Sequence, residues 1–153
     1  MRAVTLGMPL LAIVSLSACA ERPFFRVDQP TASGGVSVAL IGQRCGRRHY
    51  DRLNDVLSLQ MQVQVSNRGP ARVEIAPQRF LLLVDGDATS PEAASAIETV
   101  TPGETKVLDV RFFRFGDATC KEEMKLSIDH AVKADAQEIS LRPLSFVPSS
   151  SDV

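Results

Sequence analysis

The sequence predicts an all-β domain, an antiparallel β-sandwich of about seven to eight strands, and three observations support this prediction. Within residues 56–66, apolar and polar residues alternate strictly from Leu57 onward, which is the period of a strand with one buried face. Turn residues separate further short β-rich segments. No segment longer than one or two turns has the period of an amphipathic helix, and the connections are too short for the crossover helices of a parallel sheet.

Residues 56–66, VLSLQMQVQVS, form the strand around which the others are arranged. A helix would spread these apolar residues around its whole circumference, whereas a strand places them all on one face. The strand is expected to end at the Asn-Arg-Gly-Pro sequence of residues 67–70, because Asn and Gly tolerate a positive φ and Pro prevents continuation of the ladder. The predicted buried face consists of Leu57, Leu59, Met61, Val63 and Val65.

Seven further segments are predicted as strands. Residues 80–84, FLLLV, are apolar on both faces, which predicts a place in the middle of a sheet or under a loop. Pro102 followed by Gly103 suits the two central positions of a type II turn. Residues 88–96 are rich in small residues and predict a loop with one helical turn after Pro91. The seven strands are residues 36–41, 72–76, 80–84, 97–100, 106–114, 124–128 and 139–144.

The first 19 residues predict export. A positive residue, Arg2, precedes an apolar run at residues 6–16 that is too short to span a bilayer. The run ends in Leu-Ser-Ala-Cys at residues 16–19, which resembles the lipobox of bacterial lipoproteins at all four positions. The resemblance implies cleavage before Cys19, a thioether-linked diacylglycerol on that cysteine and usually an N-acyl chain, which together make attachment to a bilayer durable. An ordinary cleaved signal peptide and a signal-anchor helix are the alternatives.

These segments divide the chain into four parts. Residues 1–18 are the signal peptide, residues 19–35 are the lipidated Cys19 and a flexible tether, residues 36–147 are the sandwich, and residues 148–153 are a disordered tail. Ala20 follows Cys19, in place of the Asp that retains such lipoproteins in the inner membrane of many Gram-negative bacteria. The expected location is therefore the cell envelope, with the outer membrane, facing the periplasm, favoured over the inner membrane.

Two cysteines remain besides Cys19. An even pair in an exported protein predicts a disulfide, here between Cys45 and Cys120. However, Cys45 lies in an arginine-rich segment, and positive neighbours stabilise a thiolate. The alternative is a redox-active or metal-handling thiol at Cys45.

A second resemblance covers residues 56–115. The patterns LSLQMQVQVSNRGPARVEIAPQRFLLLVDG and ETVTPGETKVLDVRF are similar to Ig-like domains of small bacterial lipoproteins and other exported proteins. Shared features are the long alternating strand, the Asn-Gly-type turn, the Pro-x-x-Phe entry to the next strand and the Pro-Gly-Glu hairpin. The resemblance implies an Ig-like sandwich that acts as a non-catalytic envelope module.

Composition and spacing argue against several functional classes. A formal net charge of −1 gives no bias toward nucleic acid, and 5% aromatic residues without Trp argue against a base- or sugar-stacking surface. His49 and His130 lie far apart in the sequence, so no metal site is predicted. Asp129 and His130 would point to opposite faces of a strand, which argues against a catalytic triad with Ser127. We therefore expect no enzyme activity, catalytic residue or cofactor.

Residues 44–52 concentrate arginine, whose guanidinium fork binds phosphate and carboxylate groups in a bidentate manner. The hypothesis is an anion- or partner-binding loop at one end of the sandwich. The alternative is a solvated loop that Asp51 and Asp55 partly neutralise. The candidate binding residues are Arg44, Arg47, Arg48 and Arg52.

Together these features predict a membrane-anchored, non-catalytic lipoprotein that serves as an interaction or accessory module of a cell-envelope assembly. It would contact the lipid bilayer through acylated Cys19 and a protein partner through its loops, since loops on a rigid scaffold usually make such contacts. The alternatives are the thiol redox or metal-handling protein and a small lipoprotein inhibitor of a partner enzyme.

Overall fold

The computed structural model describes residues 26–27, 29–49, 54–93 and 96–148, and this part of the chain is built of strands and one short 3-10 helix, η1. All strand pairs are antiparallel. The predicted all-β class is therefore confirmed. The elements are β1 (Arg26–Val27), β2 (Thr31–Ser33), β3 (Val36–His49), β4 (Asp55–Asn67), β5 (Val73–Ile75), η1 (Pro77–Arg79), β6 (Leu81–Val84), β7 (Asp87–Thr89), β8 (Glu98–Val100), β9 (Thr105–Phe115), β10 (Met124–Ser127), β11 (Val132–Ala134), β12 (Gln137–Glu138) and β13 (Leu144–Val147).

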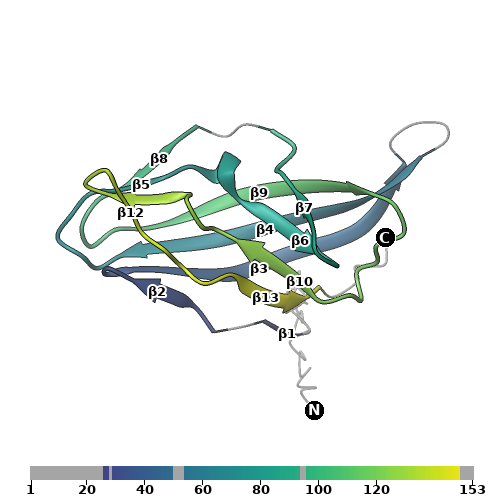
Figure 1. Cartoon of the computed structure of the whole chain (residues 1–153), viewed down its shortest axis with the longest axis horizontal. Helices are drawn as coiled ribbons and strands as arrows, with labels where there is room; N and C mark the ends of the chain where they lie inside the picture. Colours follow the sequence, from purple (N-terminus) through teal and green to yellow (C-terminus); the bar gives the residue numbers. More distant parts are fainter. Residues whose placement is uncertain (1–25, 28, 50–53, 94–95, 149–153) are drawn as a thin grey trace, which may run out of the picture.

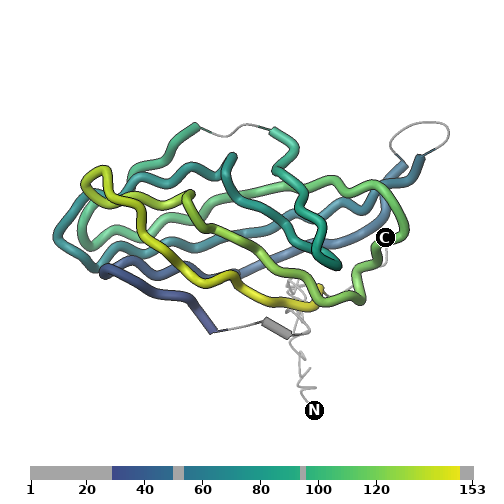
Figure 2. Tube along the Cα trace, viewed as in Figure 1, coloured from purple at the N-terminus to yellow at the C-terminus, as the bar shows by residue number. Residues whose placement is uncertain are grey.

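The strands form three sheets arranged in two layers (Figure 1). One layer is the long sheet, in the order β2-β3-β4-β9. The other layer consists of the front sheet, β1-β13-β10-β6-β7, and the side sheet, β12-β11-β5-β8. The hairpin of β3 and β4 runs along the whole molecule and forms one of its ends (Figure 2).

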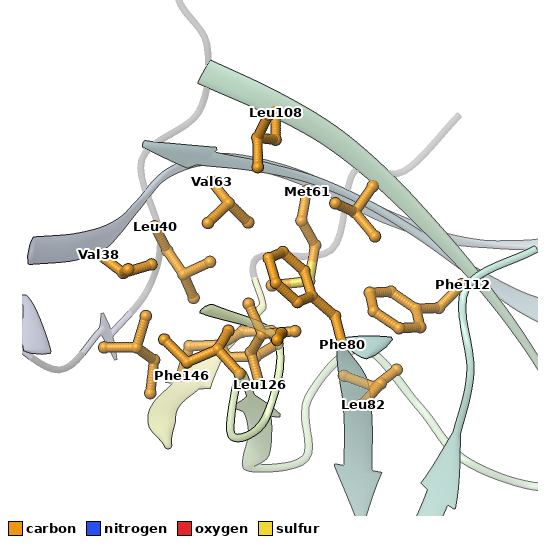
Figure 3. Packing of buried hydrophobic residues seen from close by; sticks show 14 of the residues in the cluster. Val38, Leu40, Met61, Val63, Phe80, Leu82, Leu108, Phe112, Leu126 and Phe146 are labelled. Carbon is orange, nitrogen blue, oxygen red and sulfur yellow. The ribbon is translucent and has the colours of Figure 1, made fainter. Parts of the chain in front are cut away.

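The core lies between the two layers. Figure 3 shows Val63 and Met61 of the long sheet directed toward Phe80, Leu126 and Phe146 of the opposite layer. The alternation in β4 is as predicted: the five apolar positions predicted to face inward are at most 1% exposed, and the polar positions between them are half-buried. The apolar side chains of β4 therefore form the side of the core that belongs to the long sheet.

β3 is much longer than the six residues predicted. It continues through a β-bulge at Ile41, where the register shifts between Leu40 and Gly42, and pairs with β4 as far as the His49–Asp55 pair. Glycine and charged residues disfavour strands on their own, so the sequence predicted a loop here. Pairing with β4 outweighs that preference, and the long regular strand β4 extends its neighbour.

The N-terminal boundary of the folded domain was also predicted too late. β2, which the sequence assigned to the tether, pairs with β3. Gly34 and Gly35 join the two strands with φ values of +57° and +80°, the conformation that a two-residue hairpin turn of type I′ requires. β1 pairs with β13, so Arg26 and Val27 already belong to the folded domain.

Two other hairpins have the same kind of turn. Asp85 and Gly86 join β6 to β7 with φ values of +52° and +89°. Asp135 and Ala136 join β11 to β12 with φ values of +47° and +65°. The sequence did not predict these two hairpins, and at the second turn Ala136 gave no signal because alanine seldom adopts a positive φ.

Other predicted features have mixed outcomes. β6 lies between β10 and β7, as its apolar faces predicted. The turn at Pro102 and Gly103 is present, since Gly103 has a φ of +82° and the Glu104 amide donates to the Thr101 carbonyl at 3.0 Å. The last strand was misplaced: residues 139–143 are not a strand, and β13 begins at Leu144.

Asn67 fixes the end of β4 through its side chain and not through a positive φ. Its amide nitrogen donates to the carbonyl oxygens of Ala71 (2.8 Å) and Val100 (3.0 Å), and its amide oxygen accepts from the Gly69 amide (3.0 Å). Asn67 is 1% exposed. The side chain therefore replaces water as the partner of buried backbone groups beside β5 and β8.

We expect Asn67→Ala to lower the free energy of unfolding by about 2–3 kcal/mol, because it leaves a buried carbonyl without its donor. Urea denaturation followed by circular dichroism measures the change. Ser66→Ala is the matched control: it removes an exposed hydroxyl bond to Thr105 and should cost well under half as much. Equal losses for the two variants would contradict this role for Asn67.

Candidate functional site

The arginines predicted to share one loop lie instead on two faces of a strand. Arg44 stands on the outer face of β3, opposite to its neighbour Cys45, which is in register with the core residue Leu59. Arg48 follows four positions later and therefore lies on the same face as Arg44. Arg47 lies on the opposite face, in register with the core residue Leu57. Arg52 and Cys19 lie outside the described residues.

A disulfide holds this end of β3 in place. Cys45 and Cys120 are bonded, with their Cα atoms 5.8 Å apart and a sequence separation of 75. Cys45 is 1% exposed, on the inner face of β3. The bond ties the loop between β9 and β10 to the long sheet, and it leaves no free thiol at Cys45 for the redox or metal-handling alternative.

Arginines on the inner side of this region have local partners. Arg47 donates to the Gly116 carbonyl oxygen at 3.3 Å. Arg114, whose side chain is 15% exposed, forms an ion pair with Asp87 at 3.2 Å. At the last pair of the β3–β4 hairpin before its loop, the His49 ring contacts the Asp55 carboxylate. These groups are therefore engaged within the domain.

The outer face of β3 differs. Within the ranges that the structure describes, Arg44 and Arg48 make no hydrogen bond or ion pair, and both are exposed. They are four positions apart along an extended strand, which places their Cα atoms roughly 13 Å apart. Nearby, Arg111 of β9 is in register with Gln60 and pairs with Glu92 at 3.6 Å. Arg44 and Arg48 are thus the arginines of β3 that are available to an external ligand.

A second polar cluster surrounds His130, between β10 and β11. Its Nδ1 lies 2.7 Å from a Glu138 carboxylate oxygen, and its Nε2 lies 3.4 Å from Asp129. Arg79 of η1 donates to the His130 carbonyl oxygen at 3.1 Å. The sequence prediction that Asp129 could not reach His130 is wrong, because the two residues lie in a turn and not in a strand.

The Glu138 hydrogen bond, followed by the charge of Asp129, raises the pKa of His130. The same hydrogen bond lowers the pKa of Glu138. Beside the cluster is a shallow cavity of about 90 Å³, lined in part by Glu74, Arg79 and His130. No group of three His, Cys, Asp or Glu side chains in the described ranges is arranged to hold a metal ion.

The His130 cluster should make stability depend on pH. A raised histidine pKa stabilises the fold below about pH 6.5 and loses this effect as pH rises through the folded pKa, whereas a lowered glutamate pKa stabilises it above about pH 4.5. Between about pH 4.5 and pH 6.5, the histidine and the glutamate both stabilise the fold. We expect His130→Asn to destabilise the protein more at pH 5.5 than at pH 8.5 in urea denaturation.

Asparagine is the suitable replacement because His130 has a φ of +59°, which Asn tolerates. His49→Asn, which removes another exposed histidine, is the control for the general effect of losing an imidazole. An equal loss for His130→Asn at both pH values would contradict the assignment of this pH dependence to the His130–Glu138 pair.

Comparison with known proteins gives the fold alone. No protein-family model and no curated protein matches the sequence. Among solved structures, a Bacillus subtilis protein named as a lipoprotein, YcdA, is 13% identical, with a TM-score of 0.55 over 74% of this chain. The match covers 37% of the YcdA chain, so this chain corresponds to about a third of its length.

Two further structures are similar over most of their own length. A Bordetella pertussis protein named as ApaA is 12% identical, with a TM-score of 0.50 over 82% of this chain and 98% of that chain. The structural-genomics target SoR45 is 7% identical, with a TM-score of 0.51 over 80% of this chain and 92% of that chain. At these identities the likeness concerns the fold and does not transfer an activity.

In the part of the chain that the structure describes, no helix has the length and apolar composition of a membrane-spanning segment.

Proposed function

We propose that this chain is a lipid-anchored envelope protein whose β-sandwich is a non-catalytic interaction module. The Leu-Ser-Ala-Cys sequence that ends at Cys19 supports the anchor. With Ala20 after the cysteine, the proposed location is the outer membrane, on the side that faces the periplasm. The fold likeness to a protein named as a lipoprotein agrees with this proposal without establishing it.

The observation that carries the interaction role is the pair Arg44 and Arg48. Two exposed arginines without a partner among the described residues lie on one face of a strand that a disulfide fixes at Cys45. A fixed strand presents both guanidinium groups without a large loss of backbone entropy on binding. Because arginine binds carboxylate and phosphate through two parallel hydrogen bonds, the surface suits an anionic partner.

The anchor is tested by processing in a bacterial host. Globomycin, which blocks lipoprotein signal peptidase, should cause an unprocessed precursor to accumulate, and labelled palmitate should be incorporated into the wild-type protein but not into Cys19→Ser. Membrane fractionation then places the mature protein. Normal processing in the presence of globomycin would overturn the proposed anchor.

The interaction role is tested by chemical cross-linking in intact cells, followed by mass spectrometry. The wild-type protein should give a reproducible cross-linked complex, and Arg44→Ala/Arg48→Ala should weaken it without changing the thermal unfolding temperature. A complex of unchanged yield in the double variant would remove these two arginines from the proposed role.

A further inference from the structure

The outer face of the long sheet combines exposed apolar residues with arginine. Of the large hydrophobic residues that are exposed in the described ranges, Ile41 (43%), Val107 (48%) and Phe115 (57%) lie on this face, and Ile97 is the exception. Ile41 is the extra residue of the β-bulge opposite Gln62. We call the surface formed by the outward residues of β3, β4 and β9 the outer face.

The composition of the outer face is typical of a protein interface. Its cations are Arg44, Arg48 and Arg111, and it contains no lysine. Protein interfaces are enriched in arginine and aromatic residues and depleted in lysine. The outward residues of β4 between the two edges are mostly amides and hydroxyls, which can bond to the backbone of a partner: Ser58, Gln60, Gln62, Gln64 and Ser66.

Glycine keeps part of this face flat. Gly42, Arg44, Gly46 and Arg48 follow one another at the outward positions of β3, so β3 itself places no side chain between the two arginines. At Gly42, a Cβ atom would lie 2.7 Å from the Gln62 side-chain oxygen, so the Gln62 side chain lies across the glycine. An extended segment of a partner can therefore lie close to β3 between the two arginines.

The charge of the outer face identifies the kind of partner. Arg111 is paired with Glu92, which leaves Arg44 and Arg48 against one carboxylate, Asp109, that has no partner in the described ranges. Two copies of this face would oppose an excess of positive charge in each, which disfavours self-association. A partner with negative charge is favoured, although the whole chain has a formal net charge of −1.

We propose that the outer face binds an acidic, extended segment of a partner protein. The segment would carry carboxylates four positions apart, because extended residues at that spacing lie roughly 13 Å apart and match Arg44 and Arg48. An apolar side chain of the same partner would cover Phe115, which is in register with Arg48 across β4. This inference specifies the partner of the proposed interaction module and rests on that function.

The test is site-specific photo-cross-linking of the full chain in the cells that produce it. Benzoylphenylalanine replaces Gln60, which is in register with Arg44 on one side and with Arg111 on the other. The expected product is a complex with a protein whose cross-linked peptide, sequenced by mass spectrometry, has carboxylates at the stated spacing. Arg44→Glu/Arg48→Glu should lower its yield about tenfold, since two exposed ion pairs are lost together and replaced by repulsion.

The matched control is Arg68→Glu/Arg72→Glu, which makes the same change of charge at exposed positions outside the outer face and should leave the yield unchanged. A purified wild-type protein should also bind a fluorescent synthetic copy of the cross-linked peptide, and a copy with both carboxylates changed to amides should bind about tenfold more weakly. Thermal unfolding of each variant verifies the fold.

Four outcomes would overturn the proposal: no cross-link, a cross-link to a second copy of this chain, a cross-link to lipid, or a cross-link that survives the charge reversal. The result is separable from that of the anchor. An acidic partner captured by a protein that lacks lipid at Cys19 would support the outer face and overturn the anchor. Lipidation of Cys19 without a cross-linked partner at position 60 would support the anchor and overturn the proposal for the outer face.

Discussion

Replacing Cys45 and Cys120 together by alanine is expected to lower the free energy of unfolding by about 4 kcal/mol. The disulfide closes a loop with a sequence separation of 75, and the chain-entropy model assigns a stabilisation of this size to such a loop. The bond also holds the loop between β9 and β10 on the long sheet, where Arg47 donates to the Gly116 carbonyl oxygen. Alanine is preferred to serine because both sulfur atoms are in buried residues.

The measurement is urea denaturation of the oxidised wild type, the reduced wild type and the double variant. The reduced wild type and the double variant should unfold at similar urea concentrations, well below that of the oxidised protein. Thiol titration of the unfolded, unreduced protein should find no reactive thiol at Cys45 or Cys120. Equal midpoints for all three samples would contradict a stabilising disulfide at this position.

Phe80→Ala should be comparably damaging, with an expected loss of about 3–5 kcal/mol. Phe80 follows η1, is 1% exposed, and lies between the layers of the sandwich (Figure 3). Its removal takes an aromatic ring out of the core, and the two layers cannot fully close on the space because the sheets are fixed by their own hydrogen bonds.

Phe115→Ala is the matched control, because it makes the same chemical change at a position that is 57% exposed. Its effect on the free energy of unfolding should stay within about 0.5 kcal/mol. Both variants can be followed by urea denaturation in the same buffer. Similar losses at the two positions would contradict the burial of Phe80 as the reason for the difference.

The strength of each local pattern explains how much of the fold could be predicted. In β4, the strict period of two from Leu57 to Ser66 was enough to predict both the strand and its buried face. In β9, the same alternation worked, since Leu108, Val110 and Phe112 are all buried. These strands are regular enough that no neighbour has to be known to assign them.

Where the conformation of a segment depends on the strand with which it pairs, the sequence prediction was wrong. The second half of β3 contains Gly42, Gly46 and several charges, and its strand conformation depends on pairing with β4. β11 and β12 pair across Asp135 and Ala136, a turn without the glycine that would have indicated it. The asparagine at the end of β4 was noticed for its backbone, although its side chain does the bonding.

The candidate site was found in part for the same reason. The sequence identified the arginine-rich segment, and its composition alone was enough for that. It could not divide the arginines between faces, because the division follows from the strand register, which places Arg47 with Leu57 and Arg48 with Val56. Phe115 was assigned to no site, since its exposure and its place across from Arg48 depend on the pairing of β4 with β9.

The pairing of β1 with β13 limits how far the domain can reach. In the proposed lipoprotein, the chain has seven peptide steps from Cys19 to Arg26, which span roughly 25 Å at full extension. The sandwich would thus remain within about one domain diameter of the bilayer surface. A partner embedded in, or lying on, the same membrane would be in range, whereas a partner on the far side of the periplasm would have to extend toward it.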